Sequence, residues 1–180
     1  MDLTIIIPAY NEEKNISEIY QSLKKILKDI DNTYEIIFID DGSSDSTFSE
    51  IKRLRNEDSK IRAIRFNINS GKSAALNQGF KIANGEIIIT MDADMQDDPE
   101  EIPRFIEKIK EGYDVVSGWK QKRKDPISKT VPSKIFNIVT SQITGLKLHD
   151  YNCGFKAYKK KVIKNINIYG ELHRYIPALA

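Results

Sequence analysis

The sequence predicts an α/β fold with a mostly parallel sheet and helices on both faces. Short runs of apolar and β-branched residues alternate with stretches of helical periodicity, and there is no internal repeat. Such alternation is typical of strand–helix–strand units joined by right-handed crossovers. The 180 residues, 40% of them hydrophobic and 30% charged, provide one sizeable core and are too few for two ordinary domains.

Five segments are expected to form the strands of this sheet. Residues 3–7 are continuously apolar, which is typical of a strand buried on both faces. The other expected strands are residues 36–39, 61–66, 86–91 and 113–117.

Helices are expected between these strands. Apolar residues recur at spacings of three and four over residues 16–30, which predicts a helix with one buried stripe. Residues 72–83 predict a second helix, with Gly85 as a plausible stop. Residues 99–111 predict a third, although Pro103 leaves its first residue open. After residue 118 the alternation fades, so we divide the chain into an α/β core, residues 1–118, and a second segment of the same domain, residues 119–180. That segment is expected to contain an amphipathic helix.

Charge and cysteine content exclude some classes of function. Lys and Arg total 28 against 26 acids, so nucleic acid is not an expected partner. Cys153 is the only cysteine, which argues against an intrachain disulfide and against a zinc site built from cysteines. A single cysteine is also compatible with a reducing compartment such as the cytoplasm. We expect no signal peptide and no membrane-spanning helix. The apolar C-terminal residues are expected to mark a truncation.

Acidic residues follow three of the expected strands, and they are Glu12, Asp40, Asp41, Asp92 and Asp94. The carboxyl ends of parallel strands meet at one edge of a sheet, where such folds bind ligands. These carboxylates are therefore expected to converge. Each one alone is also compatible with a solvated turn or a helix N-cap, and Asp45 is expected to be of that kind.

The segment Asp92-Ala93-Asp94-Met95-Gln96 carries the sharpest local signal. Two carboxylates and an amide oxygen leave a buried strand abruptly and offer hard oxygen ligands. Mg²⁺ and Mn²⁺ prefer such ligands and keep positions open for substrate phosphates. We therefore expect Asp92, Asp94 and Gln96 to bind Mg²⁺ or Mn²⁺.

Three motifs in order carry a family resemblance: Pro8-Ala9-Tyr10-Asn11-Glu12, Asp40-Asp41-Gly42-Ser43-Ser44-Asp45, and Asp92-Ala93-Asp94-Met95-Gln96. Together they resemble glycosyltransferase family 2, which has the GT-A fold, and within it the dolichol-phosphate mannose synthase-like, polyprenyl-phosphate glycosyltransferases. The resemblance implies a metal-dependent, inverting transfer from a UDP- or GDP-linked sugar to dolichyl or undecaprenyl phosphate. A saccharide acceptor in glycan synthesis is the alternative.

The resemblance also implies roles for individual residues. The implied nucleotide-sugar-binding residues are Pro8, Ala9, Tyr10, Glu12, Ile39, Asp41, Lys72, Asp92, Ala93 and Arg174. The implied catalytic residues are Asp94, Lys120 and Asp150. Lys72 belongs to a Gly-Lys step at a helix start, where a phosphate is favoured, although a surface lysine on a capped helix is an equal alternative.

Residues 150–158 resemble the subgroup's Asp-x-x-Ser-Gly-Phe-Arg-Ala-Tyr, except that Cys153 replaces Ser and Lys156 replaces Arg. Asp150 is the candidate that orients the acceptor or takes its proton, and a loop acid is the alternative. Since a phosphate acceptor has its second pKa near 6 by analogy with phosphorylated side chains, positioning is the simpler role. Lys120 stands where an Arg-containing pair is usual in the subgroup. An ammonium group therefore replaces a guanidinium group that could form two parallel hydrogen bonds. Lone His173 is expected to be structural.

An apolar band in residues 126–148, flanked by Lys129 and Lys134, predicts either a helix at the membrane surface or a helix packed on the core. The first alternative places the protein at the cytoplasmic face of a membrane. The sequence argues against two other classes of protein. A receiver-type signalling domain is shorter and needs no Gln96, and a non-catalytic nucleotide-sugar binder needs no Asp92, Asp94 and Gln96.

Overall fold

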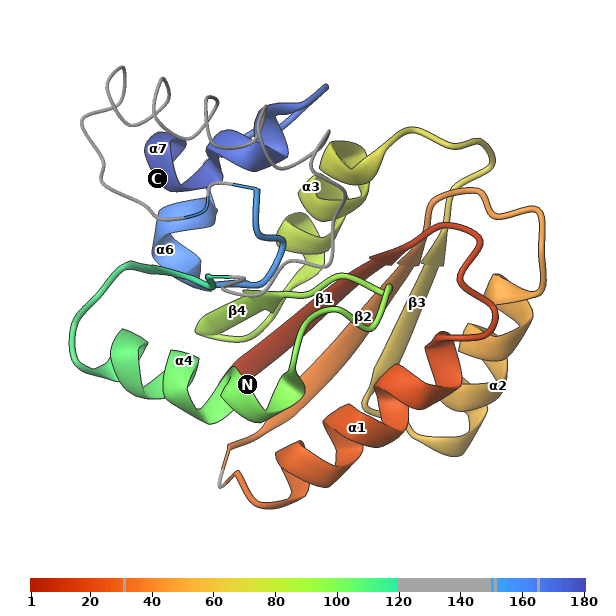
Figure 1. Ribbon diagram of the computed structural model, residues 1–180, viewed down its shortest axis with the longest axis horizontal. Helices are drawn as coiled ribbons and strands as arrows, with labels where there is room; N and C mark the ends of the chain where they lie inside the picture. The colour runs from red at the N-terminus through yellow and green to blue at the C-terminus, as the bar shows by residue number, and fades with distance from the viewer. Residues whose placement is uncertain (31, 120–149, 151, 165) are drawn as a thin grey trace.

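A computed structural model describes residues 1–30, 32–119, 150, 152–164 and 166–180. Within these residues one sheet has the strand order β3-β2-β1-β4-β6-β5 (Figure 1). Its strands are β1 (Leu3–Ala9), β2 (Tyr34–Asp40), β3 (Ile61–Arg65), β4 (Ile87–Thr90), β5 (Val115–Ser117) and β6 (Lys156–Lys159). The pairings β1–β2, β1–β4 and β2–β3 are parallel. The expected α/β fold with a mostly parallel sheet is confirmed.

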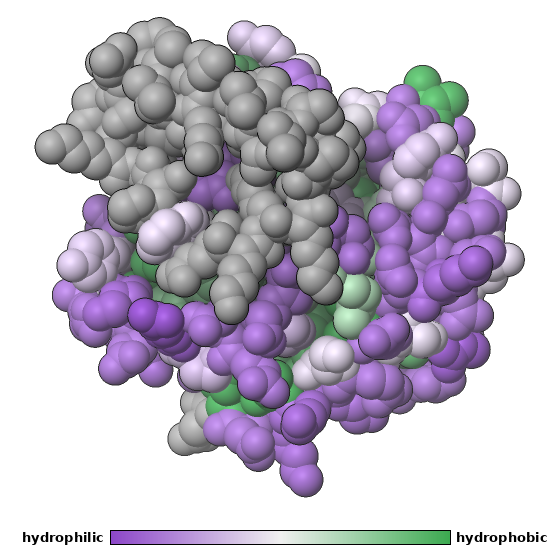
Figure 2. Space-filling model, in the orientation of Figure 1, coloured by the Kyte–Doolittle hydropathy of each residue, from purple (hydrophilic) through white to green (hydrophobic). Residues whose placement is uncertain are grey.

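Helices cover both faces of the sheet, and each face has its own apolar cluster (Figure 1). One face carries α1 (Ile16–Lys28), α2 (Thr47–Glu57) and α4 (Ile102–Lys110), and the other carries α3 (Lys72–Ile82), α6 (Lys160–Ile163) and α7 (Ile176–Leu179). Side chains alternate along a strand, so Ile5 and Ile7 of β1 join the first cluster and Ile6 joins the second. Figure 2 shows a mostly hydrophilic surface over the described part of this core.

The strand register sets where the loops open. Ala9 at the end of β1 lies beside Asp40 at the end of β2, and Ile6 lies beside Thr90 at the end of β4. The three strands run parallel, so the segments that follow them leave the sheet at the same edge. This edge is where the sequence predicted a ligand crevice.

β6 and α2 were not expected from the sequence. β6 pairs antiparallel with both β4 and β5, so the segment after residue 118 contributes a strand to the core sheet. Its four residues, Lys-Ala-Tyr-Lys, are too few and too polar to show a strand pattern. The insertion places residues 152–155 directly beside the end of β4.

The helix expected at residues 99–111 is divided into a 3₁₀ turn, η1 (Pro99–Glu101), and α4. The Asp98 carboxylate accepts a hydrogen bond from the Glu100 amide at 2.9 Å and caps the turn. The amphipathic helix expected within residues 126–148 lies outside the described residues. In the part of the chain that the structure describes, no helix is both long and apolar enough to cross a membrane.

Candidate functional site

A cleft of about 330 Å³ opens at the carboxyl ends of β1, β2 and β4. It is lined by Pro8, Ala9, Tyr10, Glu12, Asp41, Asn69, Gly71, Lys72, Asp92, Ala93 and Asp94. All of these except Asn69 and Gly71 were expected in the site, and the fold brings them together from four separate segments. Asn69 and Gly71 were not predicted; they lie just before Lys72 in the chain, and the Gly-Lys step at the start of α3 is the signal that could have indicated them.

Several hydrogen bonds hold the loop after β1 to the loop after β2 and to the first residue of α2. The Asn11 amide donates to Ser43 Oγ at 2.9 Å, the Ser44 amide donates to Asn11 Oδ1 at 2.9 Å, and the Glu12 amide donates to Thr47 Oγ1 at 2.8 Å. Asn11 has a φ of 56°, a left-handed conformation that asparagine tolerates better than most residues. The cleft wall that carries Glu12 is therefore fixed by its neighbouring loop.

Asp41 holds the loop that leads into α3. Its two carboxylate oxygens accept hydrogen bonds from the amides of Ser70 and Gly71 at 2.7 and 2.8 Å, and the residue is 4% exposed. The loop passes close over Gly42, where a Cβ would lie 2.6 Å from the Ile68 carbonyl carbon. Asp41 thus shapes the cleft as well as lining it.

Asp92 and Lys72 form an ion pair inside the cleft. Lys72 is the first residue of α3, and Asp92 follows β4 after one residue. The Asp92 amide donates to Asp97 Oδ2 at 3.0 Å, which fixes the backbone there. Asp94 is exposed, and its Oδ1 accepts from the Gln96 amide at 3.0 Å. The cleft is therefore lined by the first residue of α3, which is Lys72, and by the two carboxylates of Asp92 and Asp94.

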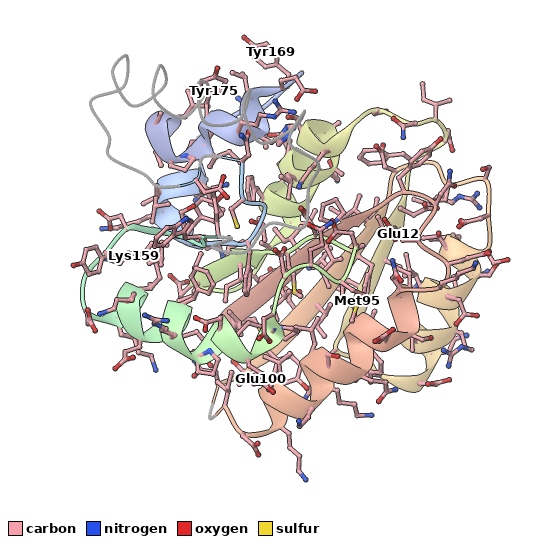
Figure 3. All side chains as sticks on the ribbon, in the orientation of Figure 1. Glu12, Met95, Glu100, Lys159, Tyr169 and Tyr175 are labelled. Carbon is pink, nitrogen blue, oxygen red and sulfur yellow. The ribbon has the colours of Figure 1, made fainter. Side chains whose placement is uncertain are left out.

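The acids of the cleft affect one another. Burial raises the pKa of the Glu12 carboxyl, and the neighbouring Asp94 and Asp92 raise it further, whereas a hydrogen bond from Asn15 opposes the rise. Figure 3 shows Glu12 and Met95 on the two loops that border the cleft. Negative charge is concentrated here, and a cation would relieve the repulsion.

The donor set fits a cation held partly by substrate. Among the residues that can be described, no group of three or more His, Cys, Asp or Glu side chains is arranged to hold a metal ion. Asp92 and Asp94 thus provide two carboxylates and no closed cage. Mg²⁺ is commonly held in this way, by one or two carboxylates with phosphate oxygens and water completing its shell.

Two predicted site residues are not among those that line the cleft. Ile39 is fully buried in the cluster beneath α3, because its position in β2 directs the side chain to that face. Gln96 lines a separate groove of about 760 Å³ beside α4, since the chain turns at Met95, where φ is 60°. Ile39 is therefore too buried for its side chain to contact a nucleotide, whereas Gln96, whose backbone amide donates to Asp94 Oδ1 at 3.0 Å, stays a predicted metal ligand.

Asp40 was expected to converge with the other acids, and the structure places it elsewhere. It is fully buried. Its carboxylate accepts from the Ser43 amide at 3.0 Å and pairs with Arg65 at 3.1 Å. Asp45 is structural, as expected, because its Oδ1 accepts from the Thr47 amide at 3.0 Å at the start of α2.

The segment after residue 149 reaches the cleft from the other side. Gly154 packs against Asp92 so closely that a Cβ would lie 2.6 Å from the Asp92 carboxyl carbon. The Gly154 carbonyl accepts a hydrogen bond from Thr90 Oγ1 at 2.7 Å. Asp150 is 3% exposed, accepts from the Asn152 amide at 3.0 Å, and is not among the residues that line the cleft.

Two basic residues near this segment differ in exposure. Lys156, to which the sequence analysis assigned no site role, is 3% exposed and donates to the Cys153 carbonyl. Burial lowers its pKa to about 8. Arg174 is exposed, pairs with Glu171 at 3.2 Å, and borders a small cavity that Lys72 also lines. Lys120 lies outside the described residues.

One family model and several known proteins match this chain. The model of Glycosyl transferase family 2 matches residues 4–166. A dodecaprenyl-phosphate galacturonate synthase of Rhizobium johnstonii is 34% identical over 181 residues, covering 99% of this chain and 54% of that protein. An undecaprenyl-phosphate 4-deoxy-4-formamido-L-arabinose transferase of Proteus mirabilis is 37% identical over 179 residues, covering 99% and 55%. The chain spans about half the length of these curated relatives.

Solved structures share the fold. S. aureus TarS 1–349 in complex with UDP has a TM-score of 0.69 and 25% identity, over 98% of this chain and 54% of that one. Glucosyl-3-phosphoglycerate synthase from Mycobacterium tuberculosis in complex with Mn²⁺ and UDP-glucose has a TM-score of 0.70 and 19% identity, over 93% and 59%.

Proposed function

The chain belongs to glycosyl transferase family 2, and from this premise we propose that it transfers a sugar from a nucleoside diphosphate sugar to a polyprenyl phosphate with inversion at the anomeric carbon. The observation that carries the donor half of the proposal is the single cleft that brings Asp92, Asp94 and Lys72 together at the strand ends. The acceptor half rests on relatives named for dodecaprenyl and undecaprenyl phosphate.

The donor lies along this cleft. Tyr10 is 47% exposed at its rim and presents a ring to the nucleoside, beside Pro8 and Ala9. The diphosphate lies over the first turn of α3, where backbone amides and the Lys72 ammonium favour negative charge. Asp41 keeps that turn in place through the amides it binds and faces the ribose or the base.

A divalent cation, Mg²⁺ or Mn²⁺, would be held by Asp92 and Asp94 together with the donor's phosphate oxygens. When bound, it supplies Lewis-acid assistance to the departing nucleoside diphosphate. The protein's own contribution is to fix both carboxylates, through the Asp97 contact to the Asp92 amide and the turn at Gln96. Lys72 releases Asp92 and turns to the phosphates.

The acceptor approaches from the side of residues 150–156. A phosphate monoester is largely ionised at neutral pH, by analogy with phosphorylated side chains whose second pKa is near 6, so it needs a positioning group more than a base. Asp150, which is 3% exposed and accepts from the Asn152 amide, takes that role. Lys120 and Arg174 attract the acceptor phosphate. Because the acceptor is a lipid, the protein works at a membrane surface, on its cytoplasmic face.

The test is a panel of UDP- and GDP-linked sugars incubated with the chain, Mg²⁺ or Mn²⁺, and either undecaprenyl phosphate or a saccharide acceptor. The proposal expects a polyprenyl-phosphate sugar in the product mass spectrum, with the anomeric configuration opposite to that of the donor. Transfer to the saccharide alone would contradict the lipid acceptor. No product from any pair would contradict the proposed function.

A further inference from the structure

The segment from Ile168 to Leu179 packs against α3, and a partly buried polar contact joins the two. The backbone amide of His173 donates to Ser73 Oγ at 3.1 Å, and His173 Nδ1 lies 2.9 Å from the same oxygen. Ser73 is 1% exposed. Around this contact Ile168 and Ile176 join Leu76 in one apolar cluster. Figure 3 shows Tyr169 and Tyr175 on the same C-terminal segment.

Ser73 Oγ accepts from the His173 amide, whereas the tautomer of the ring decides which atom donates between Ser73 Oγ and Nδ1. We take the arrangement in which the Ser73 hydroxyl donates to Nδ1, which needs a neutral imidazole with its proton on Nε2. Burial, and next the nearby Lys72 ammonium, lower the pKa of His173 to about 4, so the neutral form is the one present near pH 7. Each member of this contact is therefore satisfied.

The first turn of α3 has no cap of its own. Its N-cap is Gly71, which provides no side-chain hydrogen bond, and the first amides of a helix lack intrahelical partners. Two groups from elsewhere hold this turn. Asp41 binds the amides of residues 70 and 71, and His173 binds Ser73. Lys72 lies between these two anchors and projects to Asp92.

We propose that His173 is a positioning residue for the donor cleft: by fixing Ser73, it holds the first turn of α3 so that the Lys72 ammonium stays in the cleft. The inference rests on the proposed function, since it assigns Lys72 to the donor diphosphate. A lysine side chain is flexible, and its reach depends on where its backbone is held. Without the His173 contact the uncapped turn frays, and Lys72 spends less time in the cleft.

The experiment measures the Kd of UDP and GDP in the presence of Mn²⁺ by calorimetry. His173→Ala is expected to weaken binding about tenfold, which corresponds to about 1.4 kcal/mol, within the range of one hydrogen bond. Ser73→Ala, which removes the hydroxyl and keeps the imidazole, is expected to weaken binding similarly. His173→Asn is expected to restore most of the affinity, because its amide oxygen can stand near the Nδ1 position and accept from Ser73.

Two controls separate positioning from a general loss of stability. Ile109→Val trims a buried side chain on α4, far from α3, and is expected to lower the melting temperature while leaving Kd unchanged. In a Lys72→Met background, His173→Ala is expected to have almost no further effect on Kd, because the residue through which it acts is gone. An undiminished tenfold effect in that background would overturn the inference.

The results also distinguish the inference from its premise. If the wild-type chain binds neither UDP nor GDP, the proposed function fails and the inference fails with it. If the wild-type chain binds and folded His173→Ala binds equally well, only the positioning role is refuted.

Discussion

Gly154→Ala is the most demanding test of how the cleft is built. The added methyl carbon would lie 2.6 Å from the Asp92 carboxyl carbon, well inside contact distance, so either the carboxylate or the turn must move. Accommodating an extra methyl in a packed site costs about 1–3 kcal/mol. Asp92 is the partner that gives, since it is a side chain, whereas the turn is tied to β4 by the Thr90 hydrogen bond.

A carboxylate displaced by about 1 Å from its working position lowers the rate about 100-fold. We therefore expect Gly154→Ala to fold, to melt at a lower temperature and to transfer sugar about 100-fold more slowly, measured as kcat/KM with saturating Mn²⁺. Gly79→Ala is the matched control, because its Cβ would lie 2.6 Å from an Ile6 side-chain carbon, in the core beneath α3. The control should lose stability and keep a kcat/KM close to that of the wild type, measured in the same assay. Full activity in folded Gly154→Ala would refute the role given to the Asp92 contact.

Three further predictions concern charge. Asp94→Asn should abolish cation-dependent transfer and change the unfolding free energy by less than about 0.5 kcal/mol, since Asp94 is exposed; a large fall in melting temperature would contradict its placement. Burial lowers the pKa of His173 to about 4. Its contribution to stability is therefore complete above the unfolded-state pKa of about 6.5 and is lost as the pH falls towards 4. In pH-dependent melts, His173→Asn should lose less stability over this range than the wild type does. Because burial lowers the pKa of Lys156 to about 8, folding should gain stability as the pH rises from 8 towards the unfolded-state value of about 10.4, and Lys156→Met should lack this gain.

The parts of the site that the sequence predicted share one physical cause. Parallel strands end at one edge, so acids that follow separate strands are placed together by the sheet itself. Glu12, Asp41, Asp92 and Asp94 could be assigned to one cleft for this reason, and the structure brings them there. Lys72 could be assigned as well, because a helix start at the same edge is a local feature of the sequence.

The remaining features depend on tertiary contacts that have no local signal. Asp40 and Asp41 are adjacent, and only the position of Arg65 on the neighbouring strand decides that the first is buried in an ion pair. Gln96 lines the groove beside α4 after a left-handed turn at Met95, a backbone conformation that is unusual for methionine. The closeness of Gly154 to Asp92 follows from the insertion of β6 beside β4, and four residues with two lysines gave no indication of that strand.

The central claim is that the cleft binds a nucleoside diphosphate through a cation held by Asp92 and Asp94. The most direct measurement is a calorimetric titration of UDP and GDP into the chain, with and without Mn²⁺, for wild type and for Asp92→Asn. We expect Mn²⁺ to strengthen the binding of one nucleotide to the wild type and to have no such effect on folded Asp92→Asn. Equal affinity with and without the cation, or the same cation effect in Asp92→Asn, would contradict it.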